Sequence, residues 1–477
     1  MSRANHRYDA VIVGAGPNGL AAAITLAEAG RSVVVLEANE TIGGGCRSLD
    51  LTLPGFVHDI CSAIHPLGVA SPFFRDLPLH DFGLEWIDPP VALAHPFDDG
   101  SAAVLRRSLD ETAAGLGLDG PRWRDLFAPF VRDVEILSNA FLGPFPVPRH
   151  PVALTRFGVQ ALRSASGLAR SRFEHEPARA LFAGMAAHSM LALDRPITAS
   201  FGLMLGVFGH AAGWPMARGG SQRIADAMAD YLRSLGGTIE TNCRIDRLDQ
   251  VSQSDQVLFD LTPRQVLAIA GDVFPRHYSR QLEHFTYGAG AFKVDWALDG
   301  PVPWTAPECH EAGTLHLGGP LTEIEASERA VEQGDHPDRP FVIVSQPSRF
   351  DSTRAPAGKH TLWGYCHVPN GSTVDMTERI EAQIERFAPG FRELILKRSV
   401  MGPAELHAHN ANYIGGDING GRQDIRQLFT RPAVRLDPYS TPDPRLFICS
   451  SSTPPGGGVH GMSGYHAARS AMRRKRT

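Results

Sequence analysis

Residues 8–37 read YDAVIVGAGPNGLAAAITLAEAGRSVVVLE, and this stretch decides the fold. Residues 8–13 form a short, mostly apolar run rich in β-branched side chains, which predicts a buried parallel strand. The alanine-rich run 20–29 predicts a helix, and Gly30 directly after it is a typical helix terminator. Residues 32–37 repeat the strand pattern. Strand, helix and strand in this order predict a parallel α/β sheet.

The turn between the first strand and the helix is Gly14-Ala15-Gly16-Pro17-Asn18-Gly19, a G-x-G-x-x-G sequence. In such a turn Gly14 permits the tight bend, Gly16 lets the backbone approach a pyrophosphate, and Gly19 lets the helix lie against the sheet. The helix N-terminus offers unpaired N–H groups and a partial positive charge to the same anion. We therefore predict a Rossmann-like dinucleotide site; the alternative is a glycine-rich turn in an unrelated α/β protein.

Glu37 ends the second strand about twenty residues beyond the glycine turn, where this motif carries an acid. Its carboxylate would accept hydrogen bonds from a ribose diol. The same negative charge would repel a 2′-phosphate, which disfavours NADP at this site. FAD and NAD are therefore the dinucleotides to distinguish.

The segment after Glu37 favours FAD. Residues 40–48 read ETIGGGCRS and resemble the G-G-x-x-R-S element of FAD enzymes in the amine oxidase and phytoene desaturase superfamily. In that element the glycines pass close to the cofactor, and the arginine, here Arg47, balances pyrophosphate charge. A third glycine and Cys46 depart from the usual pattern, and a surface glycine loop is the alternative.

A second segment near the C-terminus also favours FAD. Residues 445–450 predict a strand, residues 451–464 form a glycine-rich loop that reads SSTPPGGGVHGMSG, and residues 465–472 predict a helix. The loop resembles the C-terminal FAD motif of the same superfamily, in which N–H groups at the helix start face the N1–C2 carbonyl edge of the flavin. A helix N-terminus stabilises the negative charge that reduced flavin carries there.

Along essentially its whole length the chain resembles phytoene desaturase-like FAD-dependent oxidoreductases, and within them the subgroup of pyridine nucleotide-disulfide oxidoreductase domain-containing protein 2. The resemblance implies that FAD is the cofactor and that a strand in the middle of the chain, which reaches Ile245, reads the adenine through its backbone. It implies these FAD-binding residues: Gly14, Ala15, Gly16, Pro17, Asn18, Gly19, Glu37, Ala38, Gly44, Gly45, Arg47, Ser48, Ile245, Ser452, Gly458, Val459, His460, Gly461 and Met462.

The chain has 477 residues, which is too long for one ordinary hydrophobic core. The resemblance implies an α/β fold class in which a Rossmann-like FAD-binding domain is assembled from separated pieces and carries an inserted α+β substrate-binding domain. The expected FAD-binding domain comprises residues 1–70, 215–290 and 405–477. The expected substrate-binding domain comprises residues 71–214 and 291–404.

Lys293, one of four lysines, is a candidate catalytic residue. It lies in the alternating run 290–298, which predicts a strand with Lys293 and Asp295 on one face and apolar side chains on the other. This run resembles the strand that gives amine oxidases a lysine holding a water beside flavin N5. The alternative is a solvated pair of Lys293 and Asp295 on the polar face of the strand.

Three histidines are further catalytic candidates. His460 lies in the C-terminal loop expected beside the flavin, where it could polarise a substrate or act as a base. His58 and His65 follow the glycine-rich 40–48 segment, where the chain of related enzymes runs toward the flavin face. Packing within the protein is the alternative role for each, because the chain has twenty histidines and the presence of any one of them is weak evidence for catalysis.

The inserted region indicates an apolar substrate, since phenylalanines recur between residues 127 and 208 and residues 197–217 carry no formal charge. We predict an FAD-dependent oxidoreductase that dehydrogenates (desaturates) or isomerises an apolar small molecule by hydride transfer to flavin N5. Oxygen or a quinone is the expected electron acceptor, because no second G-x-G-x-x-G is present for NAD. The alternatives are an amine oxidase-type flavoprotein that oxidises a C–N bond, which Lys293 favours, and a non-catalytic FAD-bound scaffold or regulator.

Composition narrows the remaining possibilities. A net charge of −5 provides no basic field for nucleic acid. None of the six cysteines forms a C-x-x-C pair, which argues against a metal site. The absence of such pairs and the polar start of the chain both favour a reducing, cytoplasmic location. The uncharged stretch 197–217 is expected to line a cavity, with a membrane span as the alternative, and an apolar substrate leaves a peripheral membrane contact open.

Overall fold

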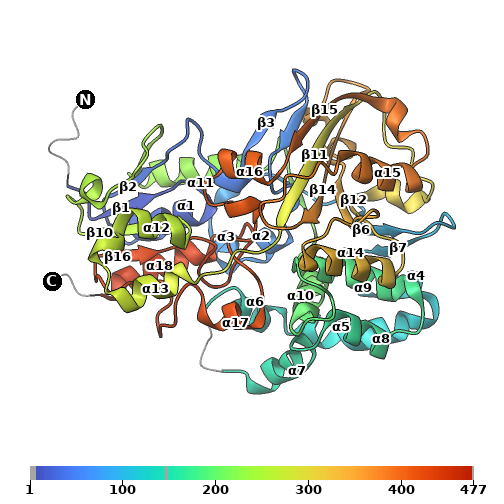
Figure 1. Cartoon of the computed structure of the whole chain (residues 1–477), viewed down its shortest axis with the longest axis horizontal. Coiled ribbons are helices and arrows are strands. Elements are labelled where there is room, and N and C mark those ends of the chain that lie inside the picture. Colours follow the sequence, from blue (N-terminus) through green and yellow to red (C-terminus); the bar gives the residue numbers. More distant parts are fainter. Residues whose placement is uncertain (1–6, 145–148, 475–477) are drawn as a thin grey trace.

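A computed structural model describes residues 7–144 and 149–474, which form two main β-sheets surrounded by helices (Figure 1). The strands of the first sheet are β1 Ala10–Val13, β2 Val33–Leu36, β9 Thr238–Glu240, β10 Gln256–Phe259 and β16 Leu446–Ile448. They run parallel in the order β16-β10-β1-β2-β9. This sheet confirms the predicted α/β fold class with a Rossmann-like parallel sheet.

The helices that cover this sheet are α1 Pro17–Glu28, α11 Gln222–Ser234, α12 Pro263–Ala270, α13 Arg276–Glu283 and α18 Met462–Arg473. α1, α11 and α18 pack on one face, and α12 and α13 on the other. Both faces need cover because the central strands are buried throughout. α18 lies very close to α1, since a Cβ at Gly464 would come within 1.8 Å of the carbonyl oxygen of Asn18.

The predicted elements of this region differ from the structure mainly at their ends. The strand expected over residues 236–245 ends at Glu240, so Ile245 lies in the loop beyond β9. Asn242 takes a left-handed backbone conformation with φ 54°, which a strand cannot continue through. β10 likewise ends at Phe259, which leaves Asp260 in the turn before α12.

The second sheet has seven strands of mixed direction. Their bounds are β6 Val91–Pro96, β7 Ala102–Leu105, β11 Gly290–Leu298, β12 Ala312–Leu317, β13 Val342–Ser345, β14 His360–Val368 and β15 Ile395–Met401, in the order β15-β11-β14-β13-β12-β6-β7. One face packs on α15 (Thr377–Phe387), and Phe292, Val294, Trp296 and Leu298 of β11 lie in that layer, as their alternation predicts. We propose that the two sheets mark the two domains expected from the sequence.

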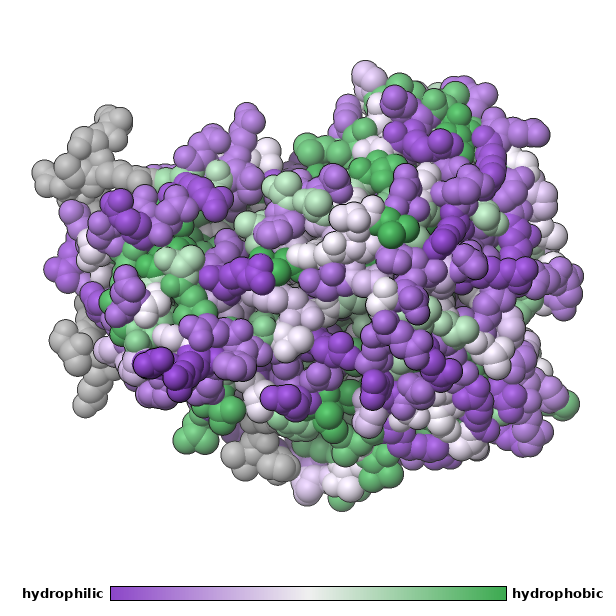
Figure 2. Space-filling model, in the orientation of Figure 1, coloured by the Kyte–Doolittle hydropathy of each residue, from purple (hydrophilic) through white to green (hydrophobic). Residues whose placement is uncertain are grey.

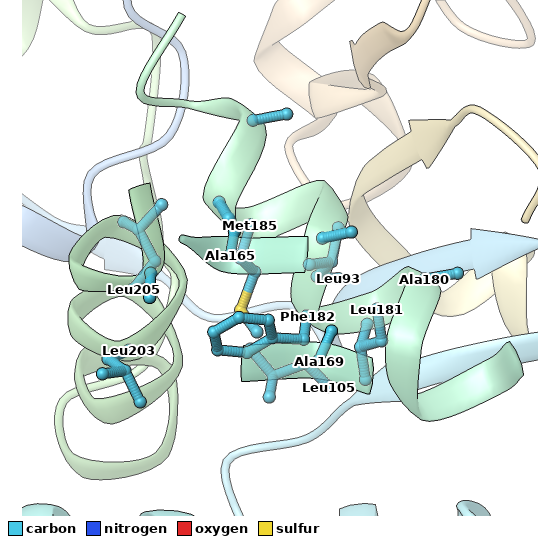
Figure 3. Packing of buried hydrophobic residues seen from close by; sticks show 14 of the residues in the cluster. Leu93, Leu105, Ala165, Ala169, Ala180, Leu181, Phe182, Met185, Leu203 and Leu205 are labelled. Atoms are coloured by element: carbon cyan, nitrogen blue, oxygen red, sulfur yellow. The ribbon is translucent and has the colours of Figure 1, made fainter. Parts of the chain in front are cut away.

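A helical region covers the end of the second sheet that carries β6 and β7 (Figure 1). Its helices are α4 Leu109–Gly115, α5 Gly120–Arg132, α6 Val134–Phe141, α7 Pro151–Ala161, α8 Ala165–Arg172, α9 Glu176–Ala187 and α10 Thr198–Ala211. Figure 3 shows Phe182 and Met185 of α9 packed between Leu203 of α10 and strand residues such as Leu105. Glycine permits this packing, because a Cβ on Gly202 would come within 2.9 Å of the Phe182 ring.

The remaining α-helices and β-strands of the described chain are mostly shorter. They are β3 Ser48–Asp50, β4 Val57–Asp59, α2 Pro66–Ala70, α3 Pro72–Asp76, β5 Trp86–Ile87, β8 Met216–Ala217, α14 Leu321–Gln333, α16 Pro403–His409 and α17 Ile425–Thr430. The uncharged stretch 197–217 forms α10 and the turn that follows it. Within the described part of the chain, no helix combines the length and the apolar character that crossing a membrane requires.

Candidate functional site

A large cavity of about 830 Å³ has walls from both sheets and from the helical region. One part, which we call the glycine half, is bounded by residues within 13–18, 36–47, 243–262, 410–423 and 450–460. The other part, the apolar half, is bounded by α6, α7, α10 and strands β12, β13 and β14. The cavity therefore connects the two glycine-rich segments at the chain ends with the apolar insertion.

The glycine turn at the start of α1 is built against Asp260. Gly14 has φ 105°, a conformation that favours glycine. A Cβ on Gly16 would come within 2.6 Å of Oδ2 of Asp260, and the Gly19 N–H donates to the same oxygen at 2.9 Å. The residues of the turn that line the cavity are Gly14, Gly16, Pro17 and Asn18. The turn thus presents the N-terminus of α1 to the cavity.

Glu37 is buried and its carboxylate lies beside the glycine turn. Oε2 accepts the Ala15 N–H at 2.8 Å, and Oε1 accepts both the backbone and side-chain N–H groups of Asn39 at 2.9 Å. Glu37 and Ala38 line the cavity, whereas Ala15 lies behind the surface and supports Glu37. These bonds hold the acid at the position where a ribose diol is expected.

The loop beyond β9 closes this end of the glycine half. The Cys243 N–H donates to the backbone oxygen of Glu37 at 2.7 Å and so ties the loop to β2. Cys243 and Ile245 both line the cavity. Ile245 therefore lies in the same cavity wall as Glu37, where the resemblance expects the adenine.

Arg47 supplies a buried positive charge to the glycine half. Its Nε donates to the Gly44 carbonyl at 3.1 Å and its Nη2 to the His409 carbonyl at 2.7 Å. Burial lowers the pKa of this guanidinium, and the nearby Glu37 counteracts that effect. Arg47, Gly44 and Gly45 all line the cavity. The glycine segment after β2 is therefore part of the site and not a surface loop.

Ser48 lies outside the cavity lining and is held by structural contacts. Its hydroxyl donates to Oδ1 of Asp59 at 2.6 Å and accepts the Gln222 N–H at 3.1 Å. Asp59 in turn forms a buried ion pair with Arg354 at 2.5 Å. Ser48 therefore joins the chain after Arg47 to α11, and no contact places it against the site.

The C-terminal loop forms the opposite wall of the glycine half, through Ser452, Gly458, Val459 and His460. His460 is buried, its Nδ1 accepts the Met462 N–H at 3.0 Å, and its Nε2 lies 3.2 Å from the Gly456 carbonyl. Burial lowers the pKa of His460 to about 4. Both ring nitrogens are engaged within the loop, so the neutral ring shapes the turn into α18. Gly461 and Met462 lie behind this turn and start α18.

The two ends of the chain meet at this site. Gly464 of α18 packs on Asn18 of α1, and the Asn18 side chain donates to the Ser451 hydroxyl at 3.3 Å. The Ser71 hydroxyl donates to the His460 carbonyl at 2.7 Å. The N-termini of α1 and α18 therefore lie side by side, and Glu37 and His460 line one cavity.

Lys293 and His58 form part of a buried polar cluster next to the cavity. Lys293 makes an ion pair with Asp295, and Nδ1 of His58 lies 3.5 Å from Oδ1 of Asp295. Lys293 is 2% exposed and Asp295 is 0% exposed, so the alternative of a solvated pair is wrong. Lys293 and His58 do not line the cavity; Trp363, whose ring centre is 5.9 Å from Nζ of Lys293, does.

His65 lines the cavity where α2 begins. Its Nε2 lies 2.9 Å from the Ser221 hydroxyl, which itself donates to the Ser62 carbonyl. Burial lowers the pKa of His65 to about 4, and its Nδ1 has no hydrogen-bond partner among residues 7–144 and 149–474. His65 is therefore neutral, and its unpartnered Nδ1 is buried rather than exposed to the cavity.

Asp260 is a site residue that the sequence reasoning missed. It lines the cavity beneath the glycine turn, and burial raises the pKa of its carboxyl to about 7, with a further rise from Glu37. Its backbone oxygen accepts a hydrogen bond from the Asn412 side chain at 3.0 Å. The available signal was its position directly after a buried parallel strand, because the carboxyl ends of such strands form ligand sites.

The apolar half is lined mainly by hydrophobic side chains. They are Phe141 and Leu142 from the end of α6, Leu154 and Ala161 from α7, Phe201, Met204, Leu205 and Phe208 from α10, Trp214, and Ile343, Trp363 and Tyr365 from the sheet. Among the described residues, the only carboxylates that line the cavity are Glu37 and Asp260, both in the glycine half. No group of three or more potential ligands within the described residues is arranged to hold a metal ion.

The cavity has exposed side chains in its lining near α7 and α17. Leu162 and Phe429 both line it and are 52% and 54% exposed. Val152 and Val159 add exposed apolar side chains on α7. Figure 2 shows hydrophobic patches along the lower edge of the molecule, where Figure 1 places these two helices. We call Leu162, Phe429, Val152 and Val159 together the apolar rim.

Comparison with known proteins gives a consistent result. Residues 12–77 match the model of the NAD(P)-binding Rossmann-like domain family. The chain is 26% identical to mouse (Mus musculus) pyridine nucleotide-disulfide oxidoreductase domain-containing protein 2, over 99% of this chain and 94% of that protein. It is 25% identical to the neurosporene-forming phytoene desaturase of Rhodobacter capsulatus, over 95% of this chain and 92% of that protein. These findings confirm the resemblance that the motifs indicate.

A solved structure shares the fold along the whole chain. An oxidoreductase from Methanosarcina mazei superposes with a TM-score of 0.66 at 16% identity, covering 98% of this chain and 100% of that one. At this level of identity the likeness concerns the fold alone. It supports the two-sheet arrangement that joins the glycine half to the apolar half.

Proposed function

We propose, from this similarity to phytoene desaturase-like proteins, that the chain is an FAD-dependent oxidoreductase acting on an apolar small molecule. The observation that carries the proposal is a single cavity in which the N-terminus of α1, the loop that leads into α18, Glu37 and Arg47 adjoin an apolar chamber. A dinucleotide bound along the glycine half would place its reactive end at the entrance to that chamber. The reaction we propose is dehydrogenation (desaturation) or isomerisation of the substrate.

The residues of the glycine half fit FAD. The N-terminus of α1 would face the pyrophosphate, and Arg47 would balance its charge. Glu37 would bind the ribose diol, and the backbone near Ile245 would contact the adenine. The N-terminus of α18, where Gly461 has φ 68°, would face the N1–C2 edge of the flavin. Bound FAD would supply the hydride acceptor for the reaction.

The chain itself would position the substrate and exclude water. Aromatic and aliphatic side chains of α10 and of the sheet surround the apolar half, so a hydrophobic substrate gains binding energy there without a specific polar contact. The four candidates for acid–base chemistry are Lys293, His460, His65 and His58. Of these, His65 and His460 line the cavity, whereas Lys293 and His58 do not.

Oxidation of an amine is the second candidate, and the buried Lys293 beside Trp363 is the observation that favours it. A cationic amine would require a carboxylate or comparable counter-charge near its nitrogen. Glu37 and Asp260, the lining carboxylates of the described chain, both lie in the glycine half. The distribution of charge therefore favours a neutral substrate. A non-catalytic FAD-bound scaffold is the remaining alternative.

The apolar rim between α7 and α17 is the entrance we propose for the substrate. A hydrophobic molecule could pass there from a membrane surface or a carrier into the apolar half with little exposure to water. We propose oxygen or a quinone as the electron acceptor, since the second dinucleotide motif that bound NAD would need is absent from the sequence.

The test is to purify the protein, record its visible spectrum, and titrate it without air against polyenes and amines. We expect bound FAD, and loss of the oxidised flavin absorbance with a neutral apolar compound. Bleaching by amines alone would show that the substrate is an amine and not a neutral apolar compound. Bound FAD that no compound reduces would favour the scaffold alternative.

A matched pair of variants locates the substrate. Phe201→Asp places a charge in the apolar half and is expected to abolish bleaching while FAD remains bound. Leu118→Asp places the same charge at a surface position that is 77% exposed and is not in the cavity lining, so it should leave bleaching intact. Equal behaviour of the two variants would contradict a substrate site in the apolar half.

A further inference from the structure

His188 is a polar residue in the wall of the apolar half. It follows the end of α9 and is half-buried, between the fully buried Ala187 and Ser189. Its ring centre lies 5.0 Å from that of His316 on β12 and 6.5 Å from that of Trp214. No role in the proposed chemistry accounts for a histidine at this place.

The contact between His188 and His316 fixes where their protons lie. Their Nε2 atoms are 3.0 Å apart, so one must donate to the other. Burial lowers the pKa of His188 to about 3 and that of His316 well below its usual value, so each neutral ring carries one proton. The question is which ring donates.

The surroundings of His316 decide this. His316 is 0% exposed, and its Nδ1 has no partner among the described residues. A Cβ on Gly184 would come within 2.6 Å of this nitrogen, so a glycine hydrogen occupies the space in front of it. A lone pair fits that contact, whereas an N–H would be crowded and unpaired, at a cost of about 1–3 kcal/mol. The proton of His316 is therefore on Nε2.

It follows that His188 accepts at Nε2 and carries its own proton on Nδ1. The ring thus offers one N–H donor whose tautomer is set by His316. Thr314 lines the same cavity and lies two residues before His316 on the same face of β12, but its hydroxyl oxygen is buried and does not face the cavity. The neighbouring lining residues Ile343, Trp363 and Trp214 carry no charge.

We propose that this end of the cavity, the histidine end, binds a neutral oxygen group (a carbonyl or a hydroxyl) of an otherwise apolar substrate, with the Nδ1–H of His188 donating to the oxygen. His188 is then a specificity residue, and His316 is a positioning residue that fixes its tautomer. This inference rests on the proposed function and narrows its substrate class from hydrocarbons to neutral oxygenated molecules.

Other ligand groups fit this end less well. An ammonium group needs an acceptor, but the free nitrogen of His188 is a donor. A carboxylate would accept the hydrogen bond, yet no cation of the described chain accompanies His188 and Thr314 in this part of the lining. A neutral oxygen matches a neutral donor without leaving a buried charge.

The first test compares 2-decanone with its isostere 2-methyl-1-decene, in which a methylene group replaces the carbonyl oxygen. Binding of each to the purified flavoprotein is measured by calorimetry without turnover. The variant is His188→Gln, whose amide reaches the Nε2 position and retains a partner for His316 but removes the Nδ1 donor. We expect this variant to weaken the binding of 2-decanone about tenfold and to leave the binding of the alkene unchanged.

Ser200→Ala is the matched control, because Ser200 lines the same half but its hydroxyl is already bonded to the Ile197 carbonyl at 2.7 Å. It should change neither affinity. Equal weakening of both ligands by His188→Gln, or no weakening of the ketone, overturns the proposal. His188→Asn, whose amide mimics the Nδ1 position, should restore part of the ketone preference.

The second test needs no variant and so holds even if His188→Gln fails to fold. Nitrogen NMR of ¹⁵N-histidine-labelled protein should show an Nδ1–H tautomer whose signal shifts with 2-decanone and stays unchanged with 2-methyl-1-decene. A shift confined to Nε2–H tautomers, or no ketone-specific shift, overturns the proposal. Both tests are independent of flavin reduction, so a protein that lacks FAD refutes the proposed function and leaves the histidine result readable.

Discussion

Individual residues in this site behave as their burial dictates. Asp260 and Glu37 are two acids beneath one glycine turn, and the burial of Asp260 raises its pKa to about 7. The histidines of the cavity wall shift in the opposite direction and stay neutral, as the values of about 4 for His65 and His460 show. The basic and acidic side chains that line the described site are few: Arg47, Arg244, Glu37 and Asp260.

Asp260 should make stability depend on pH. Its folded pKa of about 7 exceeds the unfolded value of about 3.9, so the folded protein binds a proton that the unfolded chain releases. Its contribution is complete below the unfolded value and is lost as pH rises to about 7, at up to roughly 1.4 kcal/mol per pH unit. Urea denaturation across this range measures the slope, and Asp260→Asn should flatten it. An unchanged slope in the variant would contradict the assignment.

The buried pair of Lys293 and Asp295 should be a strong stability determinant. Lys293→Met leaves the Asp295 carboxylate without its partner and should lower the free energy of unfolding by about 3–5 kcal/mol. The double variant Lys293→Met with Asp295→Asn should recover much of this loss. Denaturant titrations measure all three proteins.

The exposed pair of Lys359 and Asp299 provides the control for that prediction. These side chains are 39% and 51% exposed, so Lys359→Met should cost less than about 1 kcal/mol. Similar losses of unfolding free energy for Lys293→Met and Lys359→Met would show that burial does not make the Lys293–Asp295 pair more important for stability. If Lys293 also assists the flavin, Lys293→Met should slow reoxidation by oxygen and leave reduction by substrate intact.

At the scale of elements, the packing of α18 on α1 forms the site. The N-terminus of α1 faces the glycine half, the loop that leads into α18 lines its opposite wall, and Gly464 is the residue that lets the two helices approach. The distances within this contact leave no room for a side chain, because the opposing atom is the backbone oxygen of Asn18. The site therefore depends on a helix–helix contact between opposite ends of the sequence.

Gly464→Ala should separate the two helices, lower the free energy of unfolding by about 1–3 kcal/mol, and weaken FAD retention. Gly158→Ala, within α7, meets no atom within 4 Å and should instead stabilise the protein by up to about 1 kcal/mol. Thermal unfolding and the flavin content after gel filtration measure both effects. The contact would lose its proposed importance if the two variants behaved alike.

At the scale of the whole molecule, the glycine half is assembled from segments that the chain brings together only on folding. Residues within 13–18, 36–47, 243–262 and 410–460 contribute to its walls. A dinucleotide that contacts all of them would bind the folded protein and not the unfolded chain. Its binding would therefore raise the free energy of unfolding of the whole protein.

FAD at 100 times its dissociation constant should raise the free energy of unfolding by about 2.7 kcal/mol. NADP at the same concentration should have no such effect, because Glu37 repels the 2′-phosphate. Differential scanning fluorimetry of the cofactor-free protein compares the two additions. A colourless protein whose melting temperature FAD does not change would exclude the proposed cofactor.

The sequence by itself determined the local units of this fold. The apolar run 8–13, the glycine turn and the alanine-rich helix specify a βαβ unit because propensity, turn chemistry and periodicity agree there. The C-terminal loop and helix, and the two faces of the strand 290–298, follow from equally local patterns. Local signals of this kind need no knowledge of distant residues.

Only the tertiary structure decided which side chains meet. Lys293 and Asp295 look like a solvated pair from their alternation, yet the layers around β11 bury them. Asp260 supports the glycine turn although 241 residues separate it from Gly19, and His188 meets His316 across 128 residues. Such contacts depend on sheet register and helix packing, which sum many weak, long-range interactions, and no single stretch of sequence carries them.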